Sequence, residues 1–410
     1  MAQATPPKVR GALARRESRL AWSLLLPTVT IVSLVIILPL IAIFWISVKP
    51  VGLADLRPVQ PIVRESLRKK GEDFRIEYRV RNSSRSKPIE DVSFTDTIPA
   101  GINLLELPEY CVTDGSELSC NFGTIEGGFS ERLRIPIEGV SDESSAEERV
   151  EGSAPIVQGR GGNILTNNEF TADNFKRIFD SSEFISVLWA TVFYTVFGTI
   201  GALVVGLFAA LLLNKSFKGQ GILRGLYLFP YVSPIIAVAF TWVTLFDPFS
   251  GSFNALLLQM GVTEEPVNFF GQRPLALIMV TVFEIWRYFP LSFLFILARM
   301  QSIDHDMYEA ADMDGASPFQ KFWYLSMPQL LGILSVLFLL RFIWTFNKFD
   351  DIFLLTGGNA GTRTLTVNVY EQAFAISNIG AGAAVAVVIF AVLLTFSVLF
   401  LKYLSREEGL

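Results

Sequence analysis

The apolar residues of this chain gather in long, nearly uninterrupted runs. A helix that crosses a bilayer needs about 20 mainly apolar residues. Six runs meet that length, at about 20–48, 184–213, 222–246, 275–298, 330–355 and 379–403. The first run exceeds the roughly 7–15 apolar residues of a signal peptide, and no small-residue cleavage site follows before Lys49. The pattern therefore predicts six transmembrane helices, the first of them uncleaved.

Basic residues are concentrated in every second connection between these runs. The tail at 1–19 carries Lys8, Arg10, Arg15, Arg16 and Arg19. The connections at 247–274 and 356–378 carry one basic residue each. Because basic residues remain on the cytoplasmic side, we expect both termini in the cytoplasm and the segment 50–183 outside it.

The segment between the first two runs has a different period. Apolar residues alternate with charged ones from Phe74 to Val80 and again from Leu133 to Ile137. This alternation is typical of strands with one buried face. Between them, Thr95-Asp96-Thr97-Ile98-Pro99-Ala100-Gly101 ends a third strand in a Pro/Gly turn. The pattern predicts a small β-sandwich at 68–140, followed from residue 141 by a flexible linker rich in Ser, Glu and Gly.

Both cysteines of the chain, Cys111 and Cys120, lie in this insertion. They flank Thr113-Asp114-Gly115, where two hairpin strands would join. On the oxidising side of a membrane we expect a disulfide, worth roughly 2.5–3 kcal/mol for a loop of this size; the alternative is two buried thiols. The stretch 91–139 also resembles a repeat domain of bacterial surface proteins, whose signature is a T-D-x-[IL]-P-x-G turn followed by two cysteines. That resemblance implies a packing or adhesion module without catalytic residues.

These features predict an all-α polytopic membrane protein with a small all-β insertion. The expected organisation is a cytoplasmic tail at 1–19, a first helix at 20–48, an extracytoplasmic insertion at 50–168, a helical core at 169–404 with a cytoplasmic loop at 299–328, and a tail at 405–410.

Composition supports a membrane protein and disfavours an enzyme. Hydrophobic residues make up 51% of the 410 residues and charged residues 18%, against roughly 25% charged in globular domains. The mean hydropathy is +0.44. The net charge of −5 indicates no nucleic-acid partner, and a single histidine leaves little for a metal site or a catalytic triad. No G-x-x-x-x-G-K-[ST] motif occurs, so ATP would have to be hydrolysed by another subunit.

The loop at 299–328 predicts two short helices with a sharp joint between them. Gly315 is placed to end a first helix at 307–314. Ser317 can cap a second helix that has Pro318 at its first position, and Gln320 completes a capping box. On these features alone, an amphipathic loop lying on the membrane is the alternative to a docking element.

The spacing of residues in this loop resembles the E-A-A-x3-G-x9-I-x-L-P signature of binding-protein-dependent ABC importer permeases. The matching residues are Glu309, Ala310, Ala311, Gly315 and Pro328, with Leu325 in place of Ile and Met327 in place of Leu. The resemblance implies a coupling helix that inserts into a cytoplasmic ATPase subunit, and the fold of a type I ABC importer permease.

Further segments are similar to carbohydrate-uptake permeases of the maltose-transporter type. They are the stretches at 170–175, 229–234, 301–303, 346–350 and 354–358. Two departures from that family are Asp304, where a Pro is usual, and the position of the insertion between the first two spans.

The resemblance implies a bacterial inner-membrane protein that needs no cofactor. Its implied partners are a homologous second permease, two cytoplasmic ABC ATPase subunits, an extracytoplasmic solute-binding protein, and a sugar or sugar-like solute. A surface-anchored adhesion or sensor protein that uses the β-sandwich is the alternative function.

In this family the sugar contacts lie on the fourth and fifth spans, which implies substrate-contacting roles for Tyr288, Trp344, Phe346 and Asn347. Packing, or an interfacial belt of aromatic residues, is the alternative role for each. For the charged residues of the same spans, a structural ion pair is an alternative role, Glu284 with Arg287 or Arg341 with Asp350.

Overall fold

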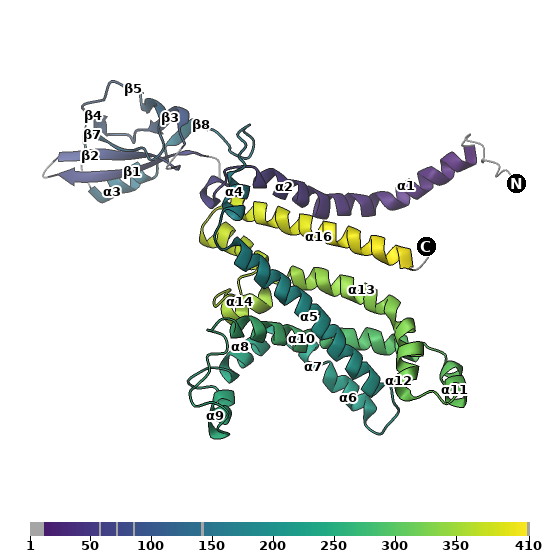
Figure 1. Cartoon of the computed structure of the whole chain (residues 1–410). Helices are drawn as coiled ribbons and strands as arrows, with labels where there is room; N and C mark the ends of the chain where they lie inside the picture. Colours follow the sequence, from purple (N-terminus) through teal and green to yellow (C-terminus); the bar gives the residue numbers. More distant parts are fainter. Residues whose placement is uncertain (1–11, 57–58, 71–72, 85–86, 141–142, 408–410) are drawn as a thin grey trace. The chain divides into compact units, whose positions relative to one another are not determined.

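The computed structural model describes residues 12–56, 59–70, 73–84, 87–140 and 143–407. Residues 1–11 and 408–410 of the predicted tails, and 141–142 of the predicted linker, lie outside the described residues. The chain divides into two compact units (Figure 1). One is helical, and the other is the β-rich unit Val48–Thr171 with Ser377–Gly380.

The helical unit has five helices in its described part that are long and apolar enough to cross a membrane. They are Arg16–Ser47, Phe184–Leu213, Leu275–Gln301, Pro318–Phe346 and Ile379–Tyr403. A sixth crossing is formed if the bent pair Gln220–Val232 and Ile235–Leu245 counts as one span. The structure thus contains up to six crossings at the predicted places.

Two of these spans contain a proline and a local π-helical turn just before it. Pro39 lies in α2 (Leu38–Ser47), which follows α1 (Ala12–Val32) through the π-turn η1 (Ser33–Ile37). Pro328 lies in α13 (Met327–Phe346), which follows α12 (Pro318–Lys321) through the π-turn η3 (Phe322–Ser326). A helical proline has no N–H for the carbonyl four residues before it and clashes with that carbonyl. A wider turn at this point relieves the clash while the helix continues.

The third predicted span is not a continuous helix, which corrects the sequence prediction. It consists of α6 (Gln220–Tyr227) and α7 (Phe229–Val232), then α8 (Ile235–Leu245) after a bend of 89°. Pro234 cannot donate to the carbonyl of Pro230, four residues earlier. The Arg287 guanidinium supplies the missing donor at 3.1 Å and also donates to the Ser233 carbonyl at 3.0 Å. A broken helix in a bilayer requires such replacement of backbone hydrogen bonds.

The fifth predicted span also ends earlier than predicted. Helix α13 stops at Phe346, and a separate helix α14 (Asp350–Thr356) follows. The Asn347 side chain donates back to the Ile343 carbonyl at 2.9 Å, and the Asn347 N–H lies 3.3 Å from the same oxygen at the helix end. The remaining helical elements are η2 (Leu53–Leu56), α4 (Asp173–Phe179), α5 (Phe184–Leu213), α9 (Ser252–Gln259), α10 (Leu275–Gln301), α11 (His305–Met313), α15 (Leu365–Tyr370), η4 (Glu371–Ala375) and α16 (Ile379–Glu407).

Helices α5 and α10 pack closely because small residues line their contact. A Cβ placed on Gly206 would lie 2.6 Å from Ser292 Cβ, and one on Gly198 would lie 2.9 Å from Glu284 Cγ. Small residues let membrane helices approach closely and gain van der Waals contact, since the hydrophobic effect offers little within lipid. This pair forms the centre of the helical unit.

The β-rich unit is a sandwich of two four-stranded antiparallel sheets, as predicted. The sheet orders are β1-β2-β7-β4 and β5-β6-β3-β8. The strands are β1 (Pro61–Lys70), β2 (Asp73–Asn82), β3 (Ile89–Thr97), β4 (Asn103–Leu104), β5 (Cys111–Asp114), β6 (Glu117–Ile125), β7 (Ser130–Glu138) and β8 (Ile156–Gly161).

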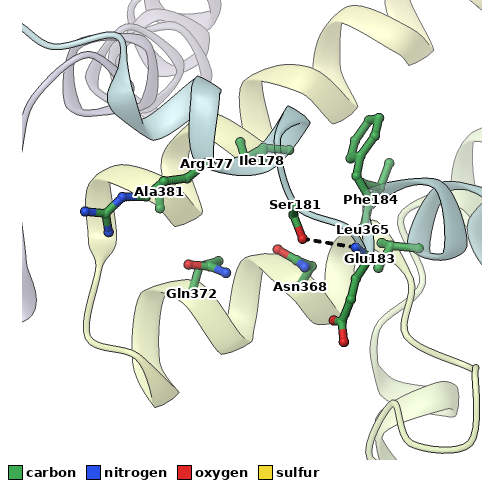
Figure 2. Close-up of a pocket in the computed structure, with 10 residues that line it drawn as sticks. Arg177, Ile178, Ser181, Glu183, Phe184, Leu365, Asn368, Gln372 and Ala381 are labelled. Atoms are coloured by element: carbon green, nitrogen blue, oxygen red, sulfur yellow. Dashed lines mark hydrogen bonds between the residues drawn. The ribbon is translucent and has the colours of Figure 1, made fainter.

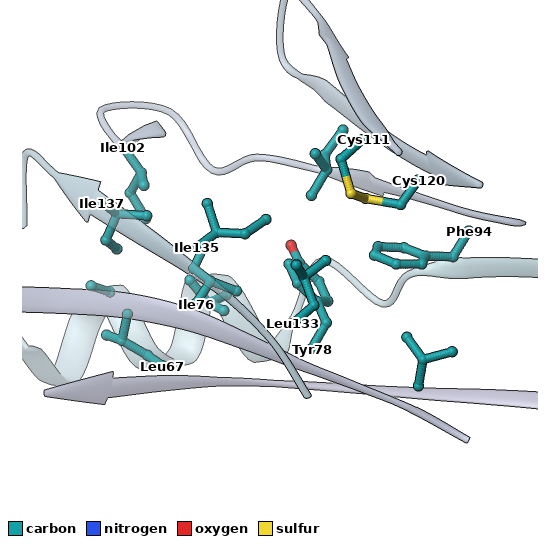
Figure 3. Close-up of a cluster of buried hydrophobic side chains, with 14 residues drawn as sticks. Leu67, Ile76, Tyr78, Phe94, Ile102, Cys111, Cys120, Leu133, Ile135 and Ile137 are labelled. Atoms are coloured by element: carbon teal, nitrogen blue, oxygen red, sulfur yellow. A yellow bond between two sulfur atoms is a disulfide. The ribbon is translucent and has the colours of Figure 1, made fainter. Parts of the chain in front are cut away.

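The alternating apolar residues of β2 and β7 fill the space between the sheets (Figure 3). Tyr78 and Phe94 meet there with ring centroids 5.0 Å apart, and the Tyr78 hydroxyl donates to the Asp96 carboxylate at 2.5 Å. Cys111 and Cys120 face each other across the β5–β6 hairpin and form a disulfide. The strands predicted at 74–80 and 133–137 are therefore confirmed.

The prediction of a flexible linker after residue 140 is wrong. Residues 143–161 contain helix α3 (Glu143–Glu151) and strand β8, which pairs with β3 at the edge of its sheet. Ala146 and Val150 of α3 belong to the buried core of the sandwich. Only these two positions, four residues apart, needed to be apolar for the helix to dock, so a polar average composition concealed it. The sandwich extends over 61–161 rather than 68–140.

Candidate functional site

Helix α11 of the loop ends in a complete Schellman motif. The Gly315 N–H donates to the Asp312 carbonyl at 3.0 Å, and the Ala316 N–H donates to the Ala311 carbonyl at 2.9 Å. Gly315 has φ +75°, the left-handed conformation that this motif requires and that favours glycine. The predicted end of the first helix at Gly315 is confirmed.

The second helix of the loop begins with the predicted capping box. Ser317 Oγ accepts from the Gln320 N–H at 3.3 Å, and Gln320 Oε1 accepts from the Ser317 N–H at 2.8 Å. Pro318 occupies the first helical turn, where no N–H is needed. This helix is not a separate short element, because it continues through η3 into the span α13.

Two side-chain contacts brace the joint between the helices. Lys321 Nζ lies 2.5 Å from Asp312 Oδ1, and the hydroxyls of Tyr308 and Ser326 are hydrogen-bonded at 2.9 Å. Together with the motifs at Gly315 and Ser317, these contacts hold the loop as one hairpin of helices. Because α12 continues through η3 into α13, these contacts attach α11 to that span.

The outer surface of this hairpin carries large apolar and aromatic side chains among exposed acidic residues. The exposed fraction is 89% for Met313, 71% for Phe319 and 77% for Tyr324. Glu309 is also exposed, with His305 Nδ1 at 3.5 Å as a neighbour on the same helix. Large apolar and aromatic side chains on a rigid, protruding element are typical of a docking surface.

Inside the helical unit, one carboxylate joins three spans. Glu284 of α10 is fully buried and accepts from Arg341 Nη2 of α13 at 2.7 Å, from Thr345 Oγ1 at 2.9 Å and from the Tyr194 hydroxyl of α5 at 2.9 Å. A buried charge is stable only when it is paired and hydrogen-bonded. Loss of either partner of the Glu284–Arg341 pair would leave the other charge uncompensated.

A second charged group lies beside this pair. The Tyr288 ring has the Arg341 guanidinium 4.7 Å and Lys348 Nζ 4.4 Å from its centroid, and its hydroxyl is hydrogen-bonded to Lys348. Lys348 Nζ also lies 3.4 Å from Asp350 Oδ1 and 3.7 Å from the buried Asp351. With the Arg287 guanidinium at 5.7 Å as well, three cations lie near the Tyr288 ring, where α10 meets α13 and the start of α14.

A small enclosed pocket lies between α4, α5, α15 and α16 (Figure 2). Asn368 and Gln372 face it from one side and Ser181 from another. Its volume is about 50 Å³, whereas pockets that hold small ligands measure about 300–1,000 Å³. It has room for one or two water molecules and cannot hold a sugar ring.

The comparison with known families agrees with the geometry of the loop. Residues 202–408, just over half of the chain, match the model of the family described as "Binding-protein-dependent transport system inner membrane component". The chain belongs to this family. It is the membrane-spanning permease subunit of a binding-protein-dependent ABC importer, and ATP hydrolysis lies in a separate subunit.

Individual relatives cover the same part of the permease. "Inner membrane ABC transporter permease protein YcjO" of Escherichia coli is 36% identical over 229 residues, which cover 56% of this chain and 76% of that protein. "Trehalose/maltose transport system permease protein MalF" of Thermococcus litoralis is 34% identical over 230 residues, covering 56% and 77%. The structure of a bacterial ABC transporter that imports the acidic polysaccharide alginate has a similar fold, with a TM-score of 0.53, 23% identity, and coverage of 59% and 86%.

The residues predicted to contact substrate differ in their exposure. Tyr288 lies against Arg341 and Lys348, while Trp344 is 49% exposed and Asn347 is exposed. Phe346 is only 2% exposed and packs into an apolar cluster with residues such as Val187 and Leu365. In this structure Phe346 is a packing residue and offers no surface to a solute.

Neither ion pair considered from the sequence is formed. Glu284 pairs with Arg341, whereas Arg287 caps backbone carbonyls and Asp350 pairs with Lys348. Sequence reasoning missed Tyr194 and Thr345, the neutral partners of Glu284. A hydroxyl in an apolar helix is too common to signal such a contact.

Proposed function

We propose that the permease forms part of the translocation pathway for a sugar or sugar-like solute. An extracytoplasmic binding protein delivers the solute to a cavity between this chain and a homologous second permease, and two cytoplasmic ABC ATPase subunits drive transport. The named substrates of a similar protein, trehalose and maltose, support the substrate class. The alternating pattern of basic loops supports cytoplasmic termini, a cytoplasmic coupling loop and an external β-sandwich.

The observation that carries this proposal is the braced hairpin of α11 and α12, with Met313, Phe319 and Tyr324 on its exposed surface. We assign ATPase coupling to Glu309, Ala310, Ala311, Gly315 and Pro328. Gly315 and the Ala311 carbonyl form the Schellman motif that sets the hairpin angle. Pro328 defines the wide turn that joins the hairpin to its span. Glu309 and Ala310 lie on the exposed helix, where they can meet a partner.

The hairpin is connected to the centre of the membrane by one helix. Pro318–Phe346 is a single span of 29 residues, about 43 Å long at the rise of an α-helix. It contains Arg341, which holds Glu284 and thereby α5 and α10. When ATP binding closes the two ATPase subunits around the hairpin, α13 moves as a rigid body. The buried pair of Glu284 and Arg341 then displaces α5 and α10 together with α13. The cavity then changes the side to which it opens.

Site-directed cross-linking tests the docking surface. Met313→Cys in the assembled transporter should form a cross-link to the ATPase subunit with a short bifunctional maleimide. The two native cysteines form a disulfide and do not react. Phe249→Cys is the matched control, because it is equally exposed (95%) but lies in a loop predicted on the opposite side. A cross-link at position 249, or none at position 313, would show that the coupling assignment is wrong.

For the solute we propose contacts from Tyr288, Trp344 and Asn347, which offer aromatic faces and an amide. Phe346 was implied by the resemblance, but its burial supports a packing role. Trp344→Ala should therefore lower solute uptake by the reconstituted transporter while binding-protein-stimulated ATPase activity and thermal stability persist. Phe346→Ala should lower thermal stability instead. Equal loss of stability in both variants would contradict a solute-contacting role for Trp344.

A further inference from the structure

The outer face of one sheet of the β-sandwich is covered by arginines. Strands β1, β2 and β7 turn their apolar residues inward, so the residues between them point outward. Arg64, Arg79 and Arg132 lie directly opposite one another across the three strands, and Arg68 lies opposite Arg75. We call this surface the arginine face; its cations are Arg64, Arg68, Arg75, Arg79, Arg132 and Arg134.

The arginine face is hollowed into an open depression of about 540 Å³. Six arginines line it together with Ser66, Glu65 and Glu77. Glu65 lies opposite the inward-facing Tyr78, so the outward side chains carry six positive charges and one negative charge, or +5. The whole chain has the opposite sign, with a net charge of −5. Positive charge is therefore concentrated at this place in an otherwise acidic protein.

The carboxylates of the chain neutralise only part of this charge. Glu77 lies 3.4 Å from Arg134, 3.8 Å from Arg132 and 3.9 Å from Arg75. Glu65 accepts instead from Ser153 and from the Ala154 N–H. Within the described residues, Arg64, Arg68 and Arg79 have no carboxylate at ion-pair distance. Like charges directly opposite one another destabilise a sheet, and a bound anion would remove that cost.

The hydrogen-bonding capacity of the face points to the same ligand chemistry. Every cation in the depression is an arginine, whose planar group binds carboxylate, sulfate or phosphate with two parallel hydrogen bonds. Arg75 Nε is buried and has no acceptor in the described part of the chain. A ligand that fits must therefore bring many acceptors and repeated negative charges.

The arrangement of the arginines favours a linear polyanion over other partners. Across the strands, Arg64, Arg79 and Arg132 follow one another about every 4.8 Å, the spacing of neighbouring strands. Along the strands the arginines are about 6.8 Å apart on β7, and about 13.6 Å apart on β1 and β2, where Ser66 and Glu77 lie between them. The lining holds no aromatic or aliphatic residue, whereas the centre of a protein interface is enriched in them. A peripheral membrane surface likewise needs apolar residues to insert, and a depression does not fit a flat bilayer.

We propose that the arginine face binds a linear saccharide chain that carries carboxylate or sulfate groups. The charged groups pair with the arginine rows, and sugar hydroxyls accept from the remaining guanidinium N–H groups. This inference goes beyond the proposed transport function; only the location of the face outside the cytoplasm rests on the proposed orientation. Held there, the saccharide is kept close to the transporter.

Binding is tested on the full-length permease in nanodiscs of zwitterionic lipid. The probes are fluorescent polygalacturonate oligomers, dextran sulfate of matched length, neutral dextran, and polyglutamate of matched charge. We expect one of the two acidic saccharides to bind, with an affinity that falls as salt rises, and neutral dextran not to bind. Whichever acidic saccharide binds more tightly identifies carboxylate or sulfate as the preferred group.

The variant that tests the site is Arg79→Ser with Arg132→Ser, which should weaken saccharide binding at least tenfold. It should fold, since it removes two opposed like charges from a solvent-facing surface. Arg160→Ser is the matched control, because Arg160 is an exposed arginine of the other sheet, paired with Asp91; it should bind like the wild type. The proposal is overturned if Arg160→Ser weakens binding equally, if polyglutamate binds as tightly as the saccharide, or if no acidic saccharide binds. The measurement uses no ATP or partner subunit, so its failure would leave the transport function intact.

Discussion

Gly315 allows the coupling hairpin to be tested through the backbone alone. A Cβ placed on this residue would meet nothing within 4 Å, so a substitution causes no clash. The whole effect comes from φ +75°. An L-residue in the left-handed region costs about 1–2 kcal/mol, and a β-branched residue costs more because this conformation is an outlier for it. Asn tolerates it better than other side chains.

This cost should appear as a smaller population of hairpins with the correct angle. A cost of about 1–2 kcal/mol lowers the ratio of correctly angled to other hairpins about 5- to 30-fold. The apparent affinity for the ATPase subunit falls with the competent fraction, by up to the same factor. We expect the affinity for the ATPase subunit to be highest with Gly or Asn at position 315, lower with Ala and lowest with Val. At a limiting concentration of the ATPase subunit, Gly315→Val should lose solute-stimulated ATPase activity.

The assay is titration of the purified ATPase subunit into the reconstituted permease, with solute-loaded binding protein present. Gly315→Asn is the control, since it adds a larger side chain than Ala but little strain. If Gly315→Asn is as defective as Gly315→Val, side-chain volume at the docking surface decides the result and the backbone argument fails. Unchanged uptake by Gly315→Val would refute a coupling role for this joint.

Three further predictions concern other parts of the chain. Burial, with the nearby Asp96 carboxyl, raises the pKa of Glu65 from 4.5 to about 7, so the folded sandwich favours the protonated form of this side chain. The free energy of unfolding of the sandwich should therefore fall by about 1–2 kcal/mol as pH rises from 4.5 to 7, after allowance for partial exposure. Hydrogen-exchange protection of β1 should show this loss in the wild type and not in Glu65→Gln. Cys111 and Cys120 should resist thiol labelling in denatured, non-reduced membranes; free labelling of both would contradict the disulfide. Arg287→Leu leaves the Pro230 and Ser233 carbonyls without donors. The free energy of unfolding in detergent should therefore fall by about 1–3 kcal/mol per carbonyl. An unchanged melting temperature would show that other groups replace the Arg287 guanidinium.

Structural features that depend only on residues close together in the sequence could be predicted. The hairpin of α11 and α12 is an example. The cap at Ser317, the proline at 318 and the helix end at Gly315 each depend on atoms within six residues of one another. The alternating strands could be predicted for the same reason, because a period of two fixes which side chains face the core. Such signals survive any change in the rest of the chain.

The break in the third span was missed because it lies within an apolar run, and an average over about 20 residues does not register one proline at 234. The fifth span ends before a short polar stretch at 347–351, but the apolar residues that follow at 352–355 made the predicted run continue to 355. The break at 234 is also stable only because Arg287, 53 residues later, replaces its lost hydrogen bond. A local reading could locate the proline but not the distant donor that lets the helix break there.

The pairing of charges inside the membrane depends on the fold as a whole. Glu284 and Arg287 are three residues apart on one helix, and that spacing made them plausible partners from sequence. The angle between α10 and its neighbours instead turns Glu284 toward α5 and α13, and Arg287 toward the broken span. A carboxylate that holds three helices together is more useful to a transporter than a pair within one helix. Arg341 lies on the same span as the proposed coupling hairpin, so we expect a movement that begins at the ATPase to reach the other spans through this buried contact.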